Sequence, residues 1–415
     1  MLLLVPARTY RAADFLTAAG RMGLELIVAS DGALPLGGRP VVHVDPGDLE
    51  GSAERIMTRT GPVAAVVAAD TPMLTLAAEV AARMGLPHNP VAAVAAAADK
   101  AVQRRLWAAA RIAQPAFRLV PPAAVPEVVE RAAVERAAVE RAAAEVGCPC
   151  VVKAISLSAS QGVLRADDTA AAVAAAGRIR LVLAAAGRAG PEPLLVEEYV
   201  PGPELSIDGL LTAGALTVTA IFDKPWTPDG PTFEETLLIT PSRRPEPVLA
   251  EAVSTAGRAA RALGLTHGPI HAELRIGERA GRPRPVMLEL AARSIGGLCS
   301  RALRFGGASL EELVLAHALG RPAPWRPDDH GRQPSGVLML PVPRPGTLLA
   351  VEGRAEAAAT PGVTGLTITI PVGQQVRPLP EGDRYLGFIF AEGDSHDRVE
   401  EALRAAQARL HVVIR

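Results

Sequence analysis

The first 90 residues alternate short apolar runs with stretches of helical character, and this alternation restricts the fold more than any other feature. The apolar runs are 2–7, 24–30, 40–45 and 63–70, and helix-like segments occupy 11–23 and 71–85. Short apolar strands that alternate with helices predict a parallel sheet covered by helices on both faces. No Gly-x-Gly-x-x-Gly motif follows the first strand, so a Rossmann-type dinucleotide site is not predicted.

Residues at the carboxyl ends of the strands in such a sheet often carry function. Four polar side chains are candidates on this ground: Thr9, Arg11, Asp31 and Asp70. The same residue types are common in caps and turns, and the sequence leaves both interpretations open.

Composition argues against several classes of protein. Apolar residues make up 49% of the 415 residues, charged residues 21%, and the net charge is −1, so neither disorder nor a polyanionic partner is indicated. Aromatic residues make up only 3%, which leaves few platforms for stacked bases. The apolar start is too short to span a membrane, and three cysteines cannot form a disulfide framework. We therefore expect a cytoplasmic protein without membrane or nucleic-acid partners.

The chain is long enough for two or three domains, and its pattern changes along its length. We predict an N-terminal parallel α/β domain over 1–95, a central domain over 96–325 and a small C-terminal α+β domain over 326–415. The tail is rich in strands with one late helix at 394–410, and it follows a Pro/Arg/Asp-rich stretch at 320–334 that is typical of a linker.

A low-complexity segment at 126–147 predicts one long helix. Alanine, glutamate and arginine are strong helix formers. Their five-residue repeat matches neither the 3.5 nor the 3.6 period. We therefore expect this helix to be exposed to solvent.

Only three of the 43 basic side chains are lysines. Lys100 opens a helical segment, Lys153 ends an apolar strand before a Ser/Gly loop at 156–163, and Lys224 lies in another strand-rich stretch. Lysine is a compact point charge, whereas arginine is a broad planar fork, so lysine suits a narrow phosphate site. A GC-rich genome would account for the many arginines but not for these positions, and we predict Lys100 and Lys153 as nucleotide-phosphate ligands.

Two strand-like runs within 271–297 each carry one glutamate, Glu273 and Glu289. On paired antiparallel strands these side chains can face the same side and close on Mg²⁺, which prefers oxygen ligands. Arg293 follows at the end of the second strand, where it can reach a phosphoryl oxygen or an oxyanion. Two glutamates on a hairpin, taken alone, are more typical of a solvated face.

These elements together resemble the ATP-grasp superfamily, in the order of that family, from Ala96 to Gly320. The resemblance implies an ATP-grasp fold, in which two α+β subdomains hold ATP and a mobile lid subdomain covers about 115–200. It implies that Glu273 and Glu289 bind magnesium, and that Lys153 and Arg293 are catalytic, with Arg293 steadying an acyl phosphate and the tetrahedral intermediate.

The resemblance also implies an ATP-binding set. It comprises Lys100 and Lys153 at the phosphates, the loop residues Ser158, Ser160, Gln161 and Gly162, the adenine-side residues Glu197, Glu198 and Val200, and Glu204 at the ribose. The implied cofactors are ATP and one or two Mg²⁺ ions, with Mn²⁺ able to substitute.

One position departs from the family pattern. Many members have Glu-x-Asn at the second metal position, whereas this chain has Ala291, which cannot coordinate a metal. The ending Glu-x-Ala-Ala-Arg resembles the branch with bacterial L-amino acid ligases and carnosine synthase. That branch implies substrate contacts from a further set: Lys224, Trp226, Glu234, Glu235, His271 and Arg275. A strand histidine such as His271 is also often structural.

We therefore expect an ATP-dependent carboxylate–amine ligase that activates a small acid, such as an amino acid, and releases ADP and phosphate. The implied partners are a small carboxylate and a small amine, and a homodimer is the default oligomer. Two alternatives stay open: an ATP-grasp carboxylase or purine-pathway enzyme that uses bicarbonate or formate, and a degenerate nucleotide-binding regulator.

Overall fold

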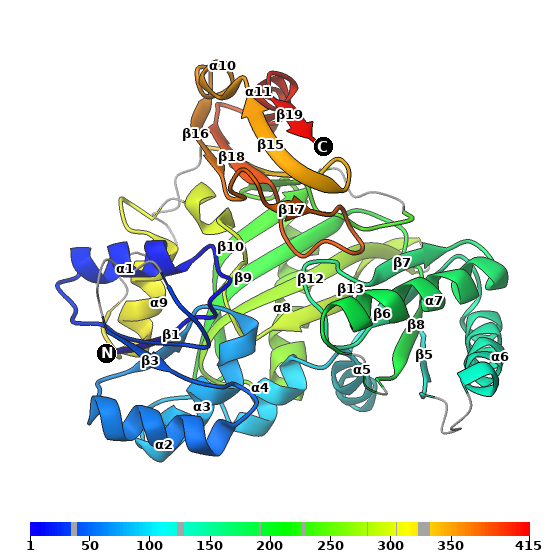
Figure 1. Cartoon of the computed structure of the whole chain (residues 1–415), viewed down its shortest axis with the longest axis horizontal. Coiled ribbons are helices and arrows are strands. Elements are labelled where there is room, and N and C mark those ends of the chain that lie inside the picture. The colour runs from blue at the N-terminus through cyan, green and yellow to red at the C-terminus, as the bar shows by residue number, and fades with distance from the viewer. Residues whose placement is uncertain are drawn as a thin grey trace.

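The computed structural model describes residues 1–34, 40–122, 128–188, 190, 192–225, 230–279, 281–303, 305–322 and 333–415. Figure 1 shows an N-terminal part at one side, a lid at the other, a large central sheet between them and a C-terminal part at the end of that sheet. The predicted class, a multidomain protein of mixed α/β and α+β architecture, is confirmed.

The N-terminal part is a parallel sheet with strand order β3-β2-β1-β4, as predicted. Its elements are β1 (Leu2–Leu4), α1 (Ala12–Arg21), β2 (Ile27–Ser30), β3 (Val41–His43), α2 (Leu49–Thr60), β4 (Val66–Ala68) and α3 (Leu74–Arg83). Leu2 and Leu4 pack into a core with α2 and α3, whereas Leu3 and Val5 pack into a core with α1 on the other face. Burial on both faces explains why the first strand is apolar at every position.

The lid is an antiparallel sheet with strand order β5-β8-β6-β7. Its elements are β5 (Phe117–Val120), α6 (Val128–Val146), β6 (Cys150–Ala154), β7 (Val163–Ala166), α7 (Thr169–Ala185) and β8 (Leu194–Glu198). The predicted long helix is α6, but the expectation that it is simply exposed is wrong. Val139 and Ala143 are fully buried in the lid core, with Ala142 beside them. Their three- and four-residue spacing puts them on one helix face, which the five-residue repeat conceals.

The central sheet has the strand order β13-β12-β9-β10-β11-β14-β18-β16. Its first five strands are β9 (Glu204–Thr212), β10 (Ala215–Lys224), β11 (Leu237–Thr240), β12 (Gly268–Arg279) and β13 (Arg282–Ala291), and the helices near it are α4 (Val91–Ala97), α5 (Lys100–Ala109), α8 (Glu246–Ala262) and α9 (Leu310–Ala318). Ala272 and Leu274 of β12 pack in one core with α5 and α8. Alternation along β12 therefore turns its polar residues to the opposite face.

The C-terminal part adds strands to this sheet and carries a second, smaller one. Its elements are β14 (Ser335–Leu340), β15 (Gly346–Glu352), α10 (Arg354–Ala358), β16 (Val363–Ile368), β17 (Gln375–Val376), β18 (Gly387–Glu392), α11 (His396–Ala408) and β19 (His411–Ile414). Because β11 pairs with β14, one sheet crosses the predicted boundary at 325/326. The division of the chain into two domains at that point therefore stays a prediction. Most of the predicted linker lies outside the described residues.

Two smaller observations bear on the class of protein. All three cysteines are free. Within the part of the chain that the structure describes, no helix has both the length and the apolarity to cross a membrane.

Candidate active site

One cleft brings together most of the predicted site residues, and the lid, the central sheet and both terminal parts contribute to its walls. The predicted residues that line it are Lys100, Lys153, Ser158, Ser160, Glu197, Glu198, Val200, Glu204, Glu235, His271, Glu273, Arg275, Glu289 and Arg293. Gln161, Gly162, Lys224 and Glu234 are not among the lining residues. Trp226 lies outside the described residues.

Lys100 enters the cleft from the first turn of α5. Asp99 caps that helix by accepting the N–H of Val102 at 2.9 Å, which fixes where the helix begins. The Lys100 amine donates to the carbonyl of Leu157 at 2.5 Å and lies 3.2 Å from a carboxylate oxygen of Glu289. It therefore connects the lid loop with a carboxylate of the central sheet.

Lys153 projects from β6 of the lid and is held by a buried carboxylate. Its amine lies 2.6 Å from one oxygen of Glu197, and Arg104 donates its Nε to the other oxygen. Burial alone would raise the pKa of Glu197, but the two cations lower it to about 2, so the group stays ionised. Both oxygens of Glu197 are thus engaged by cations, and Glu197 directs Lys153, while its place beside an adenine base stays a prediction.

The Ser/Gly loop between β6 and β7 forms the edge of the lid over the cleft. Ser158 and Ser160 line the cleft. Ala159 and Ser160 have φ values of 55° and 57°, in the left-handed region that residues with a side chain seldom adopt. The loop therefore carries its cleft-facing serines on an unusual backbone.

The other two predicted loop residues make contacts within the protein, and their part in ATP binding stays a prediction. Gln161 donates its side-chain amide to the carbonyl of Glu381 at 3.2 Å, which links the lid to the C-terminal part. Gly162 has φ 64° and is buried, and a Cβ there would lie 3.2 Å from the Cβ of Ala154. Gly162 is thus required by the backbone and by packing.

Five apolar side chains are among those that line the cleft: Pro115, Val151, Val163, Val200 and Leu288. Apolar lining of this kind suits a flat aromatic ring. Glu198 lines the same cleft and accepts the N–H of Ala116 at 3.2 Å.

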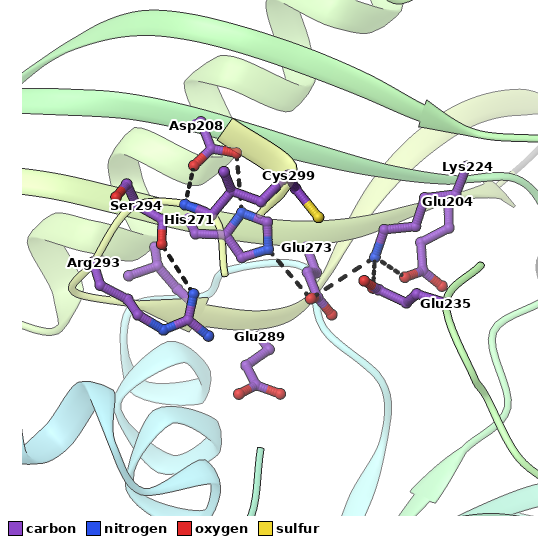
Figure 2. A network of polar contacts seen from close by, with 12 residues as sticks. Glu204, Asp208, Lys224, Glu235, His271, Glu273, Glu289, Arg293, Ser294 and Cys299 are labelled. Atoms are coloured by element: carbon purple, nitrogen blue, oxygen red, sulfur yellow. Dashed lines mark hydrogen bonds and ion pairs between the residues drawn. The ribbon is translucent and has the colours of Figure 1, made fainter. Parts of the chain in front are cut away.

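Glu273 and Glu289 lie directly opposite each other on β12 and β13, and both line the cleft. Their partners differ. Glu289 faces Lys100. Glu273 lies 3.4 Å from Nε2 of His271 and 3.8 Å from the amine of Lys224 (Figure 2). Two carboxylates that face one cleft from neighbouring strands are a donor set that fits Mg²⁺. Ala291 lines the same cleft and supplies no ligand atom.

Lys224 is the centre of an acidic cluster (Figure 2). Its amine contacts Glu204 at 2.6 Å and also contacts Glu235. Among the described residues, one group of three has carboxylate oxygens close enough to share a cation: Glu204, Glu235 and Glu273. The positively charged amine of Lys224 contacts all three. Burial raises the pKa of Glu235 to about 7, while the charge of Lys224 holds the pKa of Glu273 below its usual range despite burial.

The remaining predicted substrate residues are held mostly by protein partners. Arg275 donates to Glu204 at 3.1 Å and to the carbonyl of Val200 at 2.9 Å. Nδ1 of His271 lies 3.0 Å from Asp208. Glu234 is half-buried, and burial raises its pKa to about 6.

Arg293 lies where the central sheet meets the N-terminal part. Its Nε donates to the hydroxyl of Thr71 at 3.0 Å, in a short 3-10 helix (Thr71–Met73). Its Nη1 donates to the carbonyl of Ser294 at 3.0 Å (Figure 2). The guanidinium is therefore held in place while it lines the cleft.

The four candidates at the strand ends divide into two kinds. Thr9 and Asp70 line the cleft, with the hydroxyl donating to the carboxylate at 2.5 Å. Asp31 accepts the N–H of Ala7 and stabilises the turn after β1. Arg11 is buried and donates to the hydroxyl of Ser294 at 2.7 Å, so it helps to fix the residue that follows Arg293.

Sequence reasoning missed several residues of the site. Thr71, Asp383 and Tyr385 line the cleft, and Asp208 lies directly behind it. The tertiary fold alone brings Asp383 and Tyr385 there from the C-terminal part. A signal for Asp208 was present, because polar residues recur with period two at the start of an otherwise apolar strand, at 204, 206 and 208.

Two family comparisons agree with this geometry. The ATP-grasp domain matches residues 146–302, and L-amino acid ligase C-terminal domain 2 matches residues 338–415. A D-alanine–D-alanine ligase of Gloeobacter violaceus is 31% identical over 242 residues, which cover 56% of this chain and 72% of that protein. Carnosine synthase 1 of Gallus gallus is 36% identical over 151 residues, which are 35% of this chain and 16% of that protein.

The fold is also found in solved structures. The L-amino acid ligase from Bacillus licheniformis superposes with a TM-score of 0.78 at 23% identity, over 100% of this chain and 98% of that chain. The chain belongs to the ATP-grasp superfamily, whose fold binds ATP. Within it, the chain is of the carboxylate–amine ligase branch, with a C-terminal domain of the L-amino acid ligase type.

Proposed function

We propose that this protein joins a small carboxylic acid, such as an amino acid, to an amine through an acyl phosphate, with release of ADP and phosphate. The observation that carries the proposal is that Lys100, Lys153, Glu273, Glu289 and Arg293 all line one cleft. Cations for phosphate, facing carboxylates and a fixed guanidinium are the groups that phosphoryl transfer to a carboxylate requires.

The nucleotide is proposed to lie with its base against the apolar lining side chains Val151, Val163 and Leu288 and its phosphates between the lid and the central sheet. Lys153, directed by Glu197, would bind phosphate from the lid side, and Lys100 from the first turn of α5. Ser158 and Ser160 would cover the phosphates and exclude water, because an exposed acyl phosphate would hydrolyse. Glu204 is proposed to face the ribose.

Magnesium would be held by Glu273 and Glu289 and would neutralise charge on the phosphates when bound. Enzymes of the ATP-grasp fold use ATP and Mg²⁺. The alanine at position 291 leaves the glutamates as the metal ligands on these two strands. Mn²⁺ is proposed to substitute, since it accepts the same oxygen ligands.

Arg293 is proposed to act after phosphoryl transfer. When the amine attacks the acyl carbon, negative charge collects on the carbonyl oxygen, and a guanidinium fixed by Thr71 and Ser294 can stabilise it without reorganising. Lys224, Glu234, Glu235, His271 and Arg275 are proposed to shape the substrate side of the cleft. Lys224 contacts Glu235 and Glu204, Arg275 also contacts Glu204, and His271 contacts Asp208 and Glu273.

The test incubates the protein with ATP and Mg²⁺ while acids and amines are screened in pairs. We expect ADP, phosphate and amide in equal amounts, with ADP formation dependent on the acid. ADP formed with bicarbonate or formate and no amine would point to the carboxylase type instead. Nucleotide binding without any turnover, over a broad set of acids and amines, would favour a regulator and contradict the proposal.

A further inference from the structure

Asp208 is a buried carboxylate whose two oxygens serve two different parts of the site. It lies on β9, and only 1% of it is exposed. One oxygen accepts the backbone N–H of Ile295 at 2.7 Å, and the other lies 3.0 Å from Nδ1 of His271 (Figure 2). A buried carboxylate is costly unless it is well bonded, so a carboxylate kept here needs a reason.

The first bond fixes the segment that carries Arg293. Ile295 follows Arg293 by two residues, beyond the end of β13. Arg293 itself donates to the carbonyl of Ser294, so the position of this short segment decides where the guanidinium points. Asp208 on β9 fixes the position of this segment through its bond with the N–H of Ile295.

The second bond fixes one of the proposed metal ligands. Asp208 pairs in register with His271 on the neighbouring strand. With Nδ1 engaged by Asp208, the Nε2 atom of the same ring lies 3.4 Å from a carboxylate oxygen of Glu273. The orientation of the imidazole, and through it the position of the Glu273 oxygen, thus depends on Asp208.

We propose that Asp208 is a positioning residue that couples the metal-binding carboxylate of Glu273 to the Arg293 segment, so that both groups are placed by one buried side chain. The inference rests on the proposed function for the meaning of both groups. It assigns to Asp208, which does not line the cleft, and to His271 a role in holding the site rather than in contacting substrate.

Asp223 offers a matched control on the neighbouring strand β10. It is also buried, accepts the N–H of Arg243 at 3.0 Å and accepts the hydroxyl of Ser242 at 2.6 Å. Like Asp208, it accepts one backbone N–H and one side-chain donor, and it also lies 3.9 Å from Nε of Arg244; it does not line the cleft and serves a different loop. Asp223→Asn and Asp208→Asn remove the same charge at similar burial.

The test measures Mn²⁺ affinity in the presence of ADP by electron paramagnetic resonance, together with kcat, KM for ATP and thermal stability. For Asp208→Ala we expect about 10–100-fold weaker Mn²⁺ binding and a kcat lower by about the same factor, with KM for ATP changed little. Asp208→Asn keeps one acceptor oxygen and should recover part of both losses. Asp223→Asn should lower stability without changing either quantity.

Two outcomes would overturn the inference. One is that Asp208→Asn and Asp223→Asn lower stability alike and both keep normal Mn²⁺ binding and kcat, which would make Asp208 a structural residue. The other is a loss of ADP binding in parallel with Mn²⁺ binding, which would indicate a general collapse of the cleft. If Asp208→Ala does not fold, Asp208→Asn decides between these results. Because Mn²⁺ binding needs no turnover, the inference can hold even where the screen finds no amide product.

Discussion

The lid and the central sheet contribute charged groups to the same cleft, but they hold them in different ways. In the central sheet, Glu273 on β12 is fixed by contacts with His271 of the same strand and with Lys224 of β10. In the lid, Lys153 is directed by Glu197 of the same small sheet. The central half thus holds Glu273 within one sheet, whereas Lys153 of the lid also depends, through Glu197, on Arg104 of α5, which lies outside the lid sheet.

The largest effect should come from the central half. Glu273→Gln or Glu289→Gln removes a charge without removing volume, so each should lower turnover by at least about 10²-fold while the protein stays folded, because a metal contributes several kcal/mol of charge stabilisation. Steady-state ADP release and circular dichroism check this. Ala291→Asn is the control: it should be tolerated and change only the Mg²⁺ dependence. Near-normal turnover in either glutamine variant would show that the metal site lies elsewhere.

Arg293→Ala should separate nucleotide binding from amide formation. Removing one donor to a developing oxyanion lowers the rate by about 10²–10³-fold, so we expect little amide while ADP binding changes less than about threefold. Calorimetric titration with ADP and single-turnover amide formation measure the two quantities. Parallel loss of both would place Arg293 among the nucleotide ligands.

In the lid, Lys153→Arg should be nearly as damaging as Lys153→Ala. Arg104 already occupies one oxygen of Glu197, and a broad guanidinium at position 153 does not fit where a compact amine lies 2.6 Å from the other oxygen. Turnover at saturating ATP is the measurement, with Arg105→Lys on the exposed side of α5 as a neutral control. Full activity of the arginine variant would contradict the argument from shape.

A smaller effect is expected where the lid meets the C-terminal part. Arg178 of α7 forms a two-pronged ion pair with Glu381, at 2.7 and 3.1 Å, and both side chains are partly exposed. Such surface pairs contribute up to about 1 kcal/mol, so Arg178→Glu or Glu381→Arg should raise ADP formation without amide by about two- to fivefold. The double exchange, Arg178→Glu with Glu381→Arg, should restore the ratio of ADP to amide. An unchanged ratio of ADP to amide in both single variants would show that this contact does not help to close the lid.

The smallest effect concerns the stability of the central sheet in acid, near the start of β12. Burial, aided by the nearby His317 and His88, lowers the pKa of His267 to about 4. The unfolded chain therefore binds a proton at this histidine more readily than the folded protein does. The contribution of the neutral, buried histidine to the free energy of unfolding is complete above about pH 6.5 and is lost as the pH falls toward 4. Hydrogen exchange at pH 7 and pH 5 should show loosening near the start of β12 but not in the lid. His267→Gln should reduce this pH dependence, and exposed His43→Gln should not.

In both the lid and the central sheet, the sequence predicted those site residues whose placement follows from a local pattern. Strand periodicity placed Glu273 and Glu289 on facing strands, and the structure pairs them in register. Lys100 and Lys153 both line the cleft, as the scarcity of lysine indicated. These are local patterns, and local patterns survive in the folded chain.

Predictions failed or were incomplete where a residue's surroundings come from distant segments. The partner of Glu197 was not predicted, because Arg104, which engages it, lies 93 residues away. The helix α6 was expected to be exposed because its repeat hid the buried face around Val139. Asp208 was missed because its role depends on a loop 87 residues later.

The most direct test of the central claim follows an oxygen atom. If the carboxylate attacks the γ-phosphorus of ATP, one of its oxygens stays with the phosphate when the amine displaces it. With an acid labelled by ¹⁸O in both carboxylate oxygens, we predict one ¹⁸O in each phosphate released and none in the nucleotide. Label found in AMP, with release of pyrophosphate, or phosphate without label, would contradict an acyl phosphate at this site.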